Sequence, residues 1–114
     1  MLREIKRGEI YWVDWSPGRG SEQVGIRPSL VIQNDLGNKF SSTTIVASVI
    51  TAINKPYQFL VQFSSKESGL PQDSTVDLAM IMTIDKTRLG DKYGELSPSK
   101  MAEVDEAIKV SLGL

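Results

Sequence analysis

The chain has 114 residues, of which 40% are hydrophobic and 24% charged, with a formal net charge of −1. This length and composition allow one buried core, so we expect a single domain over residues 1–114 and no extended disorder. No apolar run approaches the ~20 residues of a membrane span, and the first residues lack the apolar stretch of a secretory signal, so we expect a cytoplasmic protein without membrane contact.

Strand patterns dominate the first half of the chain. Residues 9–15 (EIYWVDW) alternate in a β-rich run, and the glycine- and proline-containing residues 16–25 predict a surface loop. Residues 28–33 (PSLVIQ) predict a buried strand that stops at the polar residues 34–38. Residues 43–51 (TTIVASVIT) are dense in β-branched side chains and give the clearest strand prediction.

The second half changes from strands to a helix. Residues 57–63 alternate again, residues 64–73 predict a loop, and residues 74–84 predict two short strands or one bent strand. Ser97 is a suitable N-cap before Pro98, and an apolar stripe then recurs at helical spacing until Gly113. We therefore expect an α+β fold with five or six strands curled into a partial barrel and a C-terminal helix. The stripe consists of Met101, Val104, Ile108 and Leu112.

The residue types that are absent from the chain exclude several classes of catalytic site. The chain contains neither histidine nor cysteine, which excludes a Ser-His-Asp hydrolase, a thiolate nucleophile and an ordinary zinc site. The carboxylates are scattered, so we expect neither a metal site nor a cofactor. The remaining groups, chiefly Arg, Thr, Ser, Glu and Tyr, suit phosphate chemistry. The net charge of −1 is not typical of a nucleic-acid binder, so RNA binding would require locally concentrated basic groups.

Three stretches carry a family resemblance. They are RGEIYWVD at residues 7–14, GSEQVGIRP followed by VIQND at residues 20–35, and TIDK at residues 83–86. Together, in this order and spacing, they resemble the MazF/PemK family of toxin endoribonucleases over nearly the whole chain. The GSEQ-x-G-x-RP pattern is the most specific of them, whereas RGEIYWVD alone would be a weak signal.

The resemblance implies a fold, partners and an activity. The fold would be an SH3-like, CcdB-like curved antiparallel β-barrel with a C-terminal helix, assembled as a homodimer. The protein would be the toxin of a type II toxin–antitoxin system, inhibited by a cognate antitoxin that contributes DNA binding to the complex. It would cleave single-stranded RNA, often mRNA, at short sequences without a metal ion or other cofactor, leaving a 2′,3′-cyclic phosphate and a 5′-hydroxyl.

The resemblance also assigns catalytic residues. Arg27 matches the arginine of the GxRP motif, and its guanidinium presents a planar fork that fits two phosphate oxygens. The family's second catalytic group is a threonine at the end of the third strand, which here is either Thr51 or Ser48. Proton transfer falls to Glu22 as a base or to Arg27 itself as an acid, and the sequence does not choose between them.

Two tryptophans lie near the predicted loop. Trp12 is expected to fill the core, whereas Trp15, beside the loop, is expected to face RNA and stack on a base. The residues expected to bind RNA are Trp15, Arg19, Ser21, Gln23 and Lys39.

One stretch departs from the family pattern. Ala79, Met80 and Met82 stand where the family usually has an acidic residue, a glutamine and a basic residue, so fewer groups can read bases here. Two alternatives to the nuclease therefore stay open. One is a non-catalytic toxin that binds a protein target, as the CcdB group binds DNA gyrase. The other is a degenerate member that only binds an antitoxin.

Overall fold

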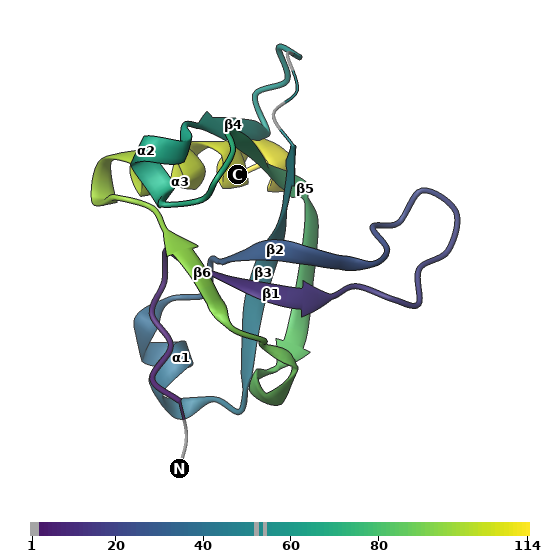
Figure 1. Cartoon of the computed structure of the whole chain (residues 1–114), viewed down its shortest axis with the longest axis vertical. Coiled ribbons are helices and arrows are strands. Elements are labelled where there is room, and N and C mark those ends of the chain that lie inside the picture. The colour runs from purple at the N-terminus through teal and green to yellow at the C-terminus, as the bar shows by residue number, and fades with distance from the viewer. Residues whose placement is uncertain (1–2, 52, 54) are drawn as a thin grey trace.

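The computed structural model describes residues 3–51, 53 and 55–114. Strands dominate this part of the chain, with three α-helices between or after them (Figure 1). In chain order the elements are β1 (Glu9–Asp14), β2 (Ile26–Val31), α1 (Asp35–Phe40), β3 (Thr43–Thr51), β4 (Leu60–Phe63), α2 (Ser65–Ser68), β5 (Ser74–Asp85), the 3₁₀ turn η1 (Lys86–Arg88), β6 (Lys92–Glu95) and α3 (Pro98–Leu112).

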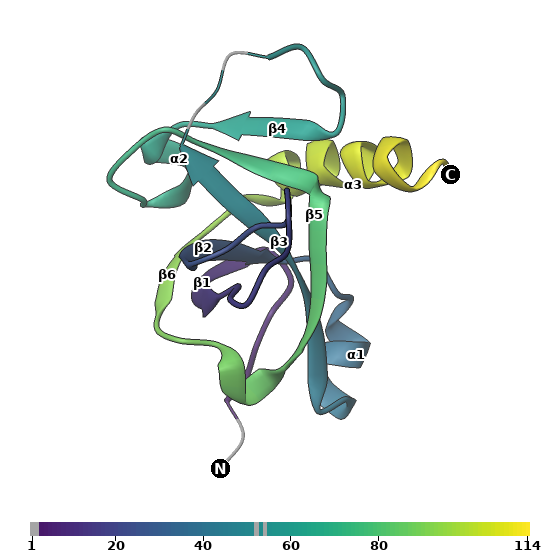
Figure 2. The ribbon, with the colours of Figure 1, turned by 90° about the vertical axis from the view of Figure 1, so that its right-hand side faces the viewer.

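The described strands form one curled antiparallel sheet in the order β4-β5-β3-β2-β1-β6. The long strands β3 and β5 run along one side of the molecule, while α3 lies beside β4 near one end and α1 near the other (Figure 2). The predicted α+β fold, a curved antiparallel barrel-like sheet with a C-terminal helix, is confirmed. None of the helices described is long and apolar enough to cross a membrane.

The strand predicted over residues 74–84 is a single bent strand. Along β5 the pairing with β3 shifts, because Ala47 lies opposite Ile81 while the next residue, Ser48, lies opposite Asp77. Residues 78–80 are thus bulged out of the ladder. The Asp77 carboxylate caps the bulge by accepting a 2.9 Å hydrogen bond from the Ala79 backbone N–H.

The predicted starts of two strands are wrong. The second strand begins at Ile26 and not at residue 28, because Ile26 and Arg27 pair with Asp14 and Val13 of β1 and extend the ladder past Pro28. The fourth strand begins at Leu60, three residues later than the pattern indicated.

Three short elements were not predicted from the sequence. Residues 34–38 begin helix α1, since the Asn34 side chain caps it by accepting from the Gly37 N–H. Helix α2 lies inside the predicted loop over residues 64–73, where Ser64 and Glu67 form a capping box. Strand β6 is too short to show a pattern of its own and is held by its pairing with β1.

Two hydrophobic clusters form the core on opposite faces of the sheet. In β1, Ile10 belongs to the cluster that packs against α3, whereas Tyr11, Val13 and the following Trp15 belong to the other. Helix α3 presents its predicted apolar face to the first cluster, except that Leu112 is 60% exposed near the end of the chain. Buried α3 residues are Met101, Val104 and Ala107.

Gly94 brings β6 against α2. A Cβ at this position would lie 2.4 Å from Leu70 Cδ1 and 2.5 Å from the Ser68 carbonyl oxygen, closer than real side chains approach. Only a residue without a side chain lets the two segments touch. Strand β6 therefore packs closely against the end of α2 at Gly94.

Candidate active site

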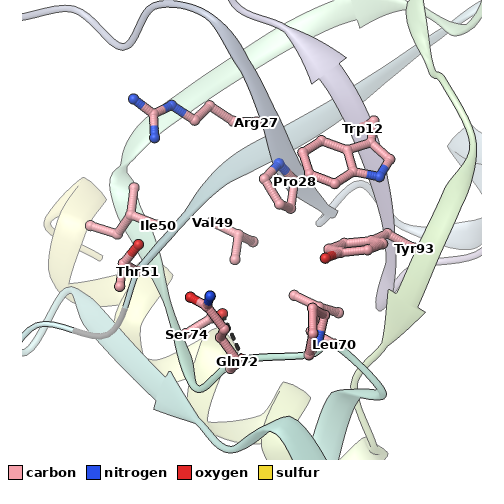
Figure 3. Close-up of a pocket in the computed structure, with 11 residues that line it drawn as sticks. Trp12, Arg27, Pro28, Val49, Ile50, Thr51, Leu70, Gln72, Ser74 and Tyr93 are labelled. Carbon is pink, nitrogen blue, oxygen red and sulfur yellow. Dashed lines mark hydrogen bonds between the residues drawn. The ribbon is translucent and has the colours of Figure 1, made fainter.

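A pocket of about 190 Å³ opens between β1, β2, β3, β6 and the segment that leads from α2 into β5 (Figure 3). Arg27 from β2 and Thr51 from the end of β3 both line it, although 23 residues of chain separate them. We call it the Arg27 pocket. Its lining residues are Trp12, Arg27, Pro28, Val49, Ile50, Thr51, Leu70, Pro71, Gln72, Ser74 and Tyr93.

Arg27 is held by its strand while its guanidinium reaches solvent. The backbone pairs with Val13, and the side-chain Nε donates a 3.3 Å hydrogen bond to the Val24 carbonyl oxygen. Within the described residues, no carboxylate lies within ion-pair distance of Arg27. The remaining N–H donors of the fork can therefore meet an anion, and a phosphate accepts such a fork with two oxygens.

The structure separates the two candidates for the strand-end hydroxyl. Ser48 is fully buried, and its hydroxyl donates a 3.1 Å hydrogen bond to Gln23 Oε1, away from the pocket. Thr51 is the last residue of β3, is exposed, and lines the pocket beside Arg27. Thr51 therefore fits a hydroxyl that contacts substrate, whereas Ser48 holds the β1–β2 loop.

Glu22 lies in a second pocket of about 270 Å³ rather than in the Arg27 pocket. Its carboxylate accepts a 2.5 Å hydrogen bond from the Arg19 backbone N–H, which fixes the turn of the loop. We call this second site the Met80 pocket. Its lining residues are Trp15, Pro17, Gly18, Glu22, Gln23, Ala79, Met80, Ile81 and Met82.

The expectation for the two tryptophans is wrong. Trp15 is only 7% exposed, and its indole N–H donates a 2.9 Å hydrogen bond to Ser29 Oγ. Trp12 is half-buried and lines the Arg27 pocket, with its ring 4.6 Å from that of Tyr93. Successive side chains of a strand alternate between faces, so Trp15 shares the buried face of Tyr11 and Val13. The signal that could have predicted the burial of Trp15 is its spacing of two residues from Val13 and four from Tyr11, which places all three on one face of the strand.

The other predicted RNA-binding residues are spread over the surface. Arg19 and Ser21 are exposed in the β1–β2 loop, and Gln23 is half-buried there against Ser48. Lys39 lies in the last turn of α1, which precedes β3, so the length of that strand separates it from Thr51. The structure therefore does not bring Lys39 to the Arg27 pocket.

Sequence reasoning missed Gln72, Ser74 and Tyr93 as pocket residues. Gln72 lies in the predicted loop after α2, Ser74 is the first residue of the predicted strand β5, and Tyr93 lies on the unpredicted β6. No group of three or more carboxylates that could hold a metal ion occurs in the described part of the chain.

Comparison with known proteins identifies relatives over nearly the full length. Residues 6–112 match the family described as PemK-like, MazF-like toxin of type II toxin-antitoxin system. Endoribonuclease MazF of Staphylococcus epidermidis is 50% identical over 111 residues, which cover 96% of this chain and 92% of that protein. Endoribonuclease EndoA of Bacillus subtilis is 49% identical over 111 residues, 96% of each chain.

Solved structures show the same fold. MazF from Deinococcus radiodurans superposes with a TM-score of 0.82 at 23% identity, covering 99% of this chain and all of that one. A mycobacterial endoribonuclease in complex with its cognate antitoxin gives a TM-score of 0.79 at 24% identity, covering 96% of each chain. From the family match and the two relatives at about half identity, the chain belongs to the PemK-like, MazF-like toxins of type II toxin–antitoxin systems.

Proposed function

We propose that this toxin is a metal-independent endoribonuclease that cleaves single-stranded RNA, including mRNA, at short sequences in the cytoplasm. The single observation that carries the proposal is the Arg27 pocket, which is lined both by Arg27, a guanidinium without a carboxylate partner among the described residues, and by the hydroxyl-bearing Thr51. The relatives named endoribonuclease support the same activity.

The pocket suits cleavage by the substrate's own 2′-hydroxyl. In that reaction the 2′-oxygen forms a bond to phosphorus while the bond to the 5′-oxygen breaks, which gives a 2′,3′-cyclic phosphate and a 5′-hydroxyl. Negative charge grows on the nonbridging phosphate oxygens, and a guanidinium fork stabilises that charge. The Thr51 hydroxyl would donate a second hydrogen bond to the same group.

Two protons must move in this reaction, one from the 2′-hydroxyl and one to the leaving 5′-oxygen. Arg27 lines the pocket, whereas the Glu22 carboxylate lines the Met80 pocket and accepts from the Arg19 N–H. This arrangement argues against Glu22 as the base for the 2′-hydroxyl proton, which water can accept, and it favours Arg27 as the acid that delivers a proton to the leaving 5′-oxygen.

We also propose that the toxin acts as a homodimer and is inhibited by a cognate antitoxin that covers the Arg27 pocket and the β1–β2 loop. Solved relatives include an endoribonuclease in complex with its cognate antitoxin and MazE–MazF of Deinococcus radiodurans. Light scattering should give a dimer, and a fully active monomer at micromolar concentration would contradict this assembly.

The activity is tested with purified protein on a long RNA of mixed sequence in EDTA. Cleavage should persist, and the fragments should carry 2′,3′-cyclic phosphate and 5′-hydroxyl ends. Activity that returns only with Mg²⁺ would overturn the metal-free mechanism. An intact dimer that cleaves no RNA under either condition would favour a toxin that binds a protein target.

A further inference from the structure

The Arg27 pocket has two chemically different walls. Figure 3 shows Trp12, Tyr93 and Pro28 on one side and Arg27 with Thr51 on the other, while Gln72 and Ser74 lie at a third side. One wall is thus aromatic and apolar, and the other carries a cation and a hydroxyl. A nucleotide has the same division, since its base is a flat apolar-faced ring and its phosphate is an anion.

We propose that Trp12, supported by Tyr93, is the platform on which one base of the RNA substrate stacks while Arg27 holds the adjoining phosphate. This inference rests on the proposed nuclease function and adds a positioning site for the base. The pocket of about 190 Å³ is smaller than the roughly 300 Å³ at which sites for whole small molecules begin. It therefore suits a single base.

The Trp12 backbone is anchored by hydrogen bonds, and its indole packs against a neighbouring ring. Its backbone N–H donates to the Asp91 carbonyl at 3.1 Å, and its carbonyl accepts from the Gly90 N–H at 2.7 Å. The Tyr93 ring packs against the indole at 4.6 Å between centroids, tilted by 44°. An aromatic neighbour at this distance stabilises the ring, so little side-chain freedom is lost when a base binds.

The aromatic wall can also compensate for the Met80 pocket, in which few hydrogen-bonding groups are available to read bases. Stacking tolerates any base because every base has an aromatic face, so it can supply affinity where hydrogen-bonding groups that read bases are few. Trp15 cannot serve in this way, since its indole is buried and bonded to Ser29.

Steady-state cleavage provides the first test. Trp12→Leu keeps an apolar side chain but removes the aromatic face, and it should raise KM about 5- to 150-fold, the loss expected for one stacked base, with a smaller change in kcat. Trp12→Phe should restore most of the affinity. Phe40→Ala, which removes a 75% exposed aromatic ring from α1, is the matched control and should leave KM unchanged. Equal KM values for the wild type and Trp12→Leu would overturn the proposal.

The second test uses single-stranded 2′-deoxy oligonucleotides, which lack the attacking hydroxyl and so bind without cleavage. One abasic position is moved along the oligonucleotide, and Kd is measured for the wild type and for Trp12→Leu. At one position the missing base should weaken wild-type binding by a similar 5- to 150-fold and leave Trp12→Leu binding unchanged. Equal losses in both proteins at every position would overturn the stacking platform.

Fluorescence separates this inference from the proposed function. The chain has two tryptophans, so Trp12→Leu retains only the buried Trp15. Oligonucleotide binding should quench the wild type and leave Trp12→Leu unquenched, whereas equal quenching in both would contradict stacking on Trp12. A protein that cleaves no RNA but shows the selective quenching would refute the nuclease and keep the base platform. Cleavage that does not depend on Trp12 would support the nuclease and refute the base platform.

Discussion

The Arg27 pocket and the Met80 pocket share no lining residue, and their polar groups are used differently. In the Arg27 pocket, Arg27 and Thr51 point to solvent from ordered strands. In the Met80 pocket, the Glu22 carboxylate accepts from Arg19 and the Gln23 amide oxygen accepts from Ser48, while methionines cover much of the remainder. If the proposed function holds, the groups for phosphate chemistry lie in the Arg27 pocket, and the Met80 pocket contributes shape and apolar contact.

The largest expected effect comes from removing the guanidinium. Arg27→Ala should lower kcat by about 10²–10³-fold or more, because a preorganised donor to the developing charge is lost. Arg27→Lys should also be severely impaired, since an ammonium cannot form the bidentate fork. Cleavage assays check both variants, with circular dichroism to show that the fold is intact.

Glu22→Gln is the matched control from the Met80 pocket. An amide oxygen can still accept from the Arg19 N–H, so this variant should retain most of its activity. If Glu22→Gln lost as much activity as Arg27→Ala, the separation of the two pockets would be wrong.

A second comparison sets the two hydroxyls of β3 against each other. Thr51→Val should lower kcat about 10- to 150-fold, the range for one hydrogen bond to a charged group, with thermal stability unchanged. Ser48→Ala should instead lower the melting temperature, because Gln23 loses its buried partner, while kcat changes little. The reverse pattern would assign catalysis to Ser48.

A smaller effect is expected in base preference. With Ala79, Met80 and Met82 lining the second pocket, the cleavage motif should be looser than is usual for the family. Met80→Gln adds a donor and an acceptor, and it should sharpen the preference at one position by about 2- to 10-fold, the value of one net hydrogen bond. Sequencing of cleavage ends from a mixed transcript pool measures both. A wild-type motif of five or more defined bases would refute the idea.

The smallest expected effect is on folding stability and comes from Glu9, which lies outside both pockets. Burial raises the pKa of the Glu9 carboxyl, but hydrogen bonds from the Lys6 backbone and the Lys92 ammonium outweigh burial and hold that pKa below its ordinary value of 4.5. A carboxyl with a lowered pKa stabilises the fold above that ordinary value, and this contribution is lost as the pH falls through the pKa of the folded state.

Glu9→Gln should therefore cost about 1 kcal/mol of unfolding free energy at neutral pH and nothing at acid pH, while cleavage is unchanged. Urea unfolding at several pH values measures the difference. A cost that stayed constant with pH would show that packing rather than charge is responsible.

The sequence predicted those parts of the molecule that depend on local pattern. Residues 43–51 and the terminal helix follow directly from β-branched density, a capping residue and an apolar stripe. The Arg27 position followed from the family resemblance, and the structure then placed Thr51 rather than Ser48 beside it.

The parts that were missed depend on contacts between distant segments. Strand β6 exists because β1 offers it an edge, and the four-residue helix α2 is too short to show a period. Tyr93 reaches the pocket on β6, and Gln72 reaches it from the segment that follows α2. The exchange of Trp12 and Trp15 had a different cause, because Trp15 continues the buried face of Tyr11 and Val13 while Trp12 lies on the other face and is only half-buried.

The close approach at Gly94 has a consequence for how this protein tolerates change. Leu70, which a side chain at Gly94 would strike, also lines the Arg27 pocket, and Tyr93, the preceding residue in the chain, lines it beside Leu70 (Figure 3). Any substitution at Gly94 would thus displace Leu70 and Tyr93 while leaving Arg27 and Thr51 on their own strands. Such a protein would retain its reactive groups and lose the dimensions of the space in which they act, so substrate choice would drift before catalysis failed.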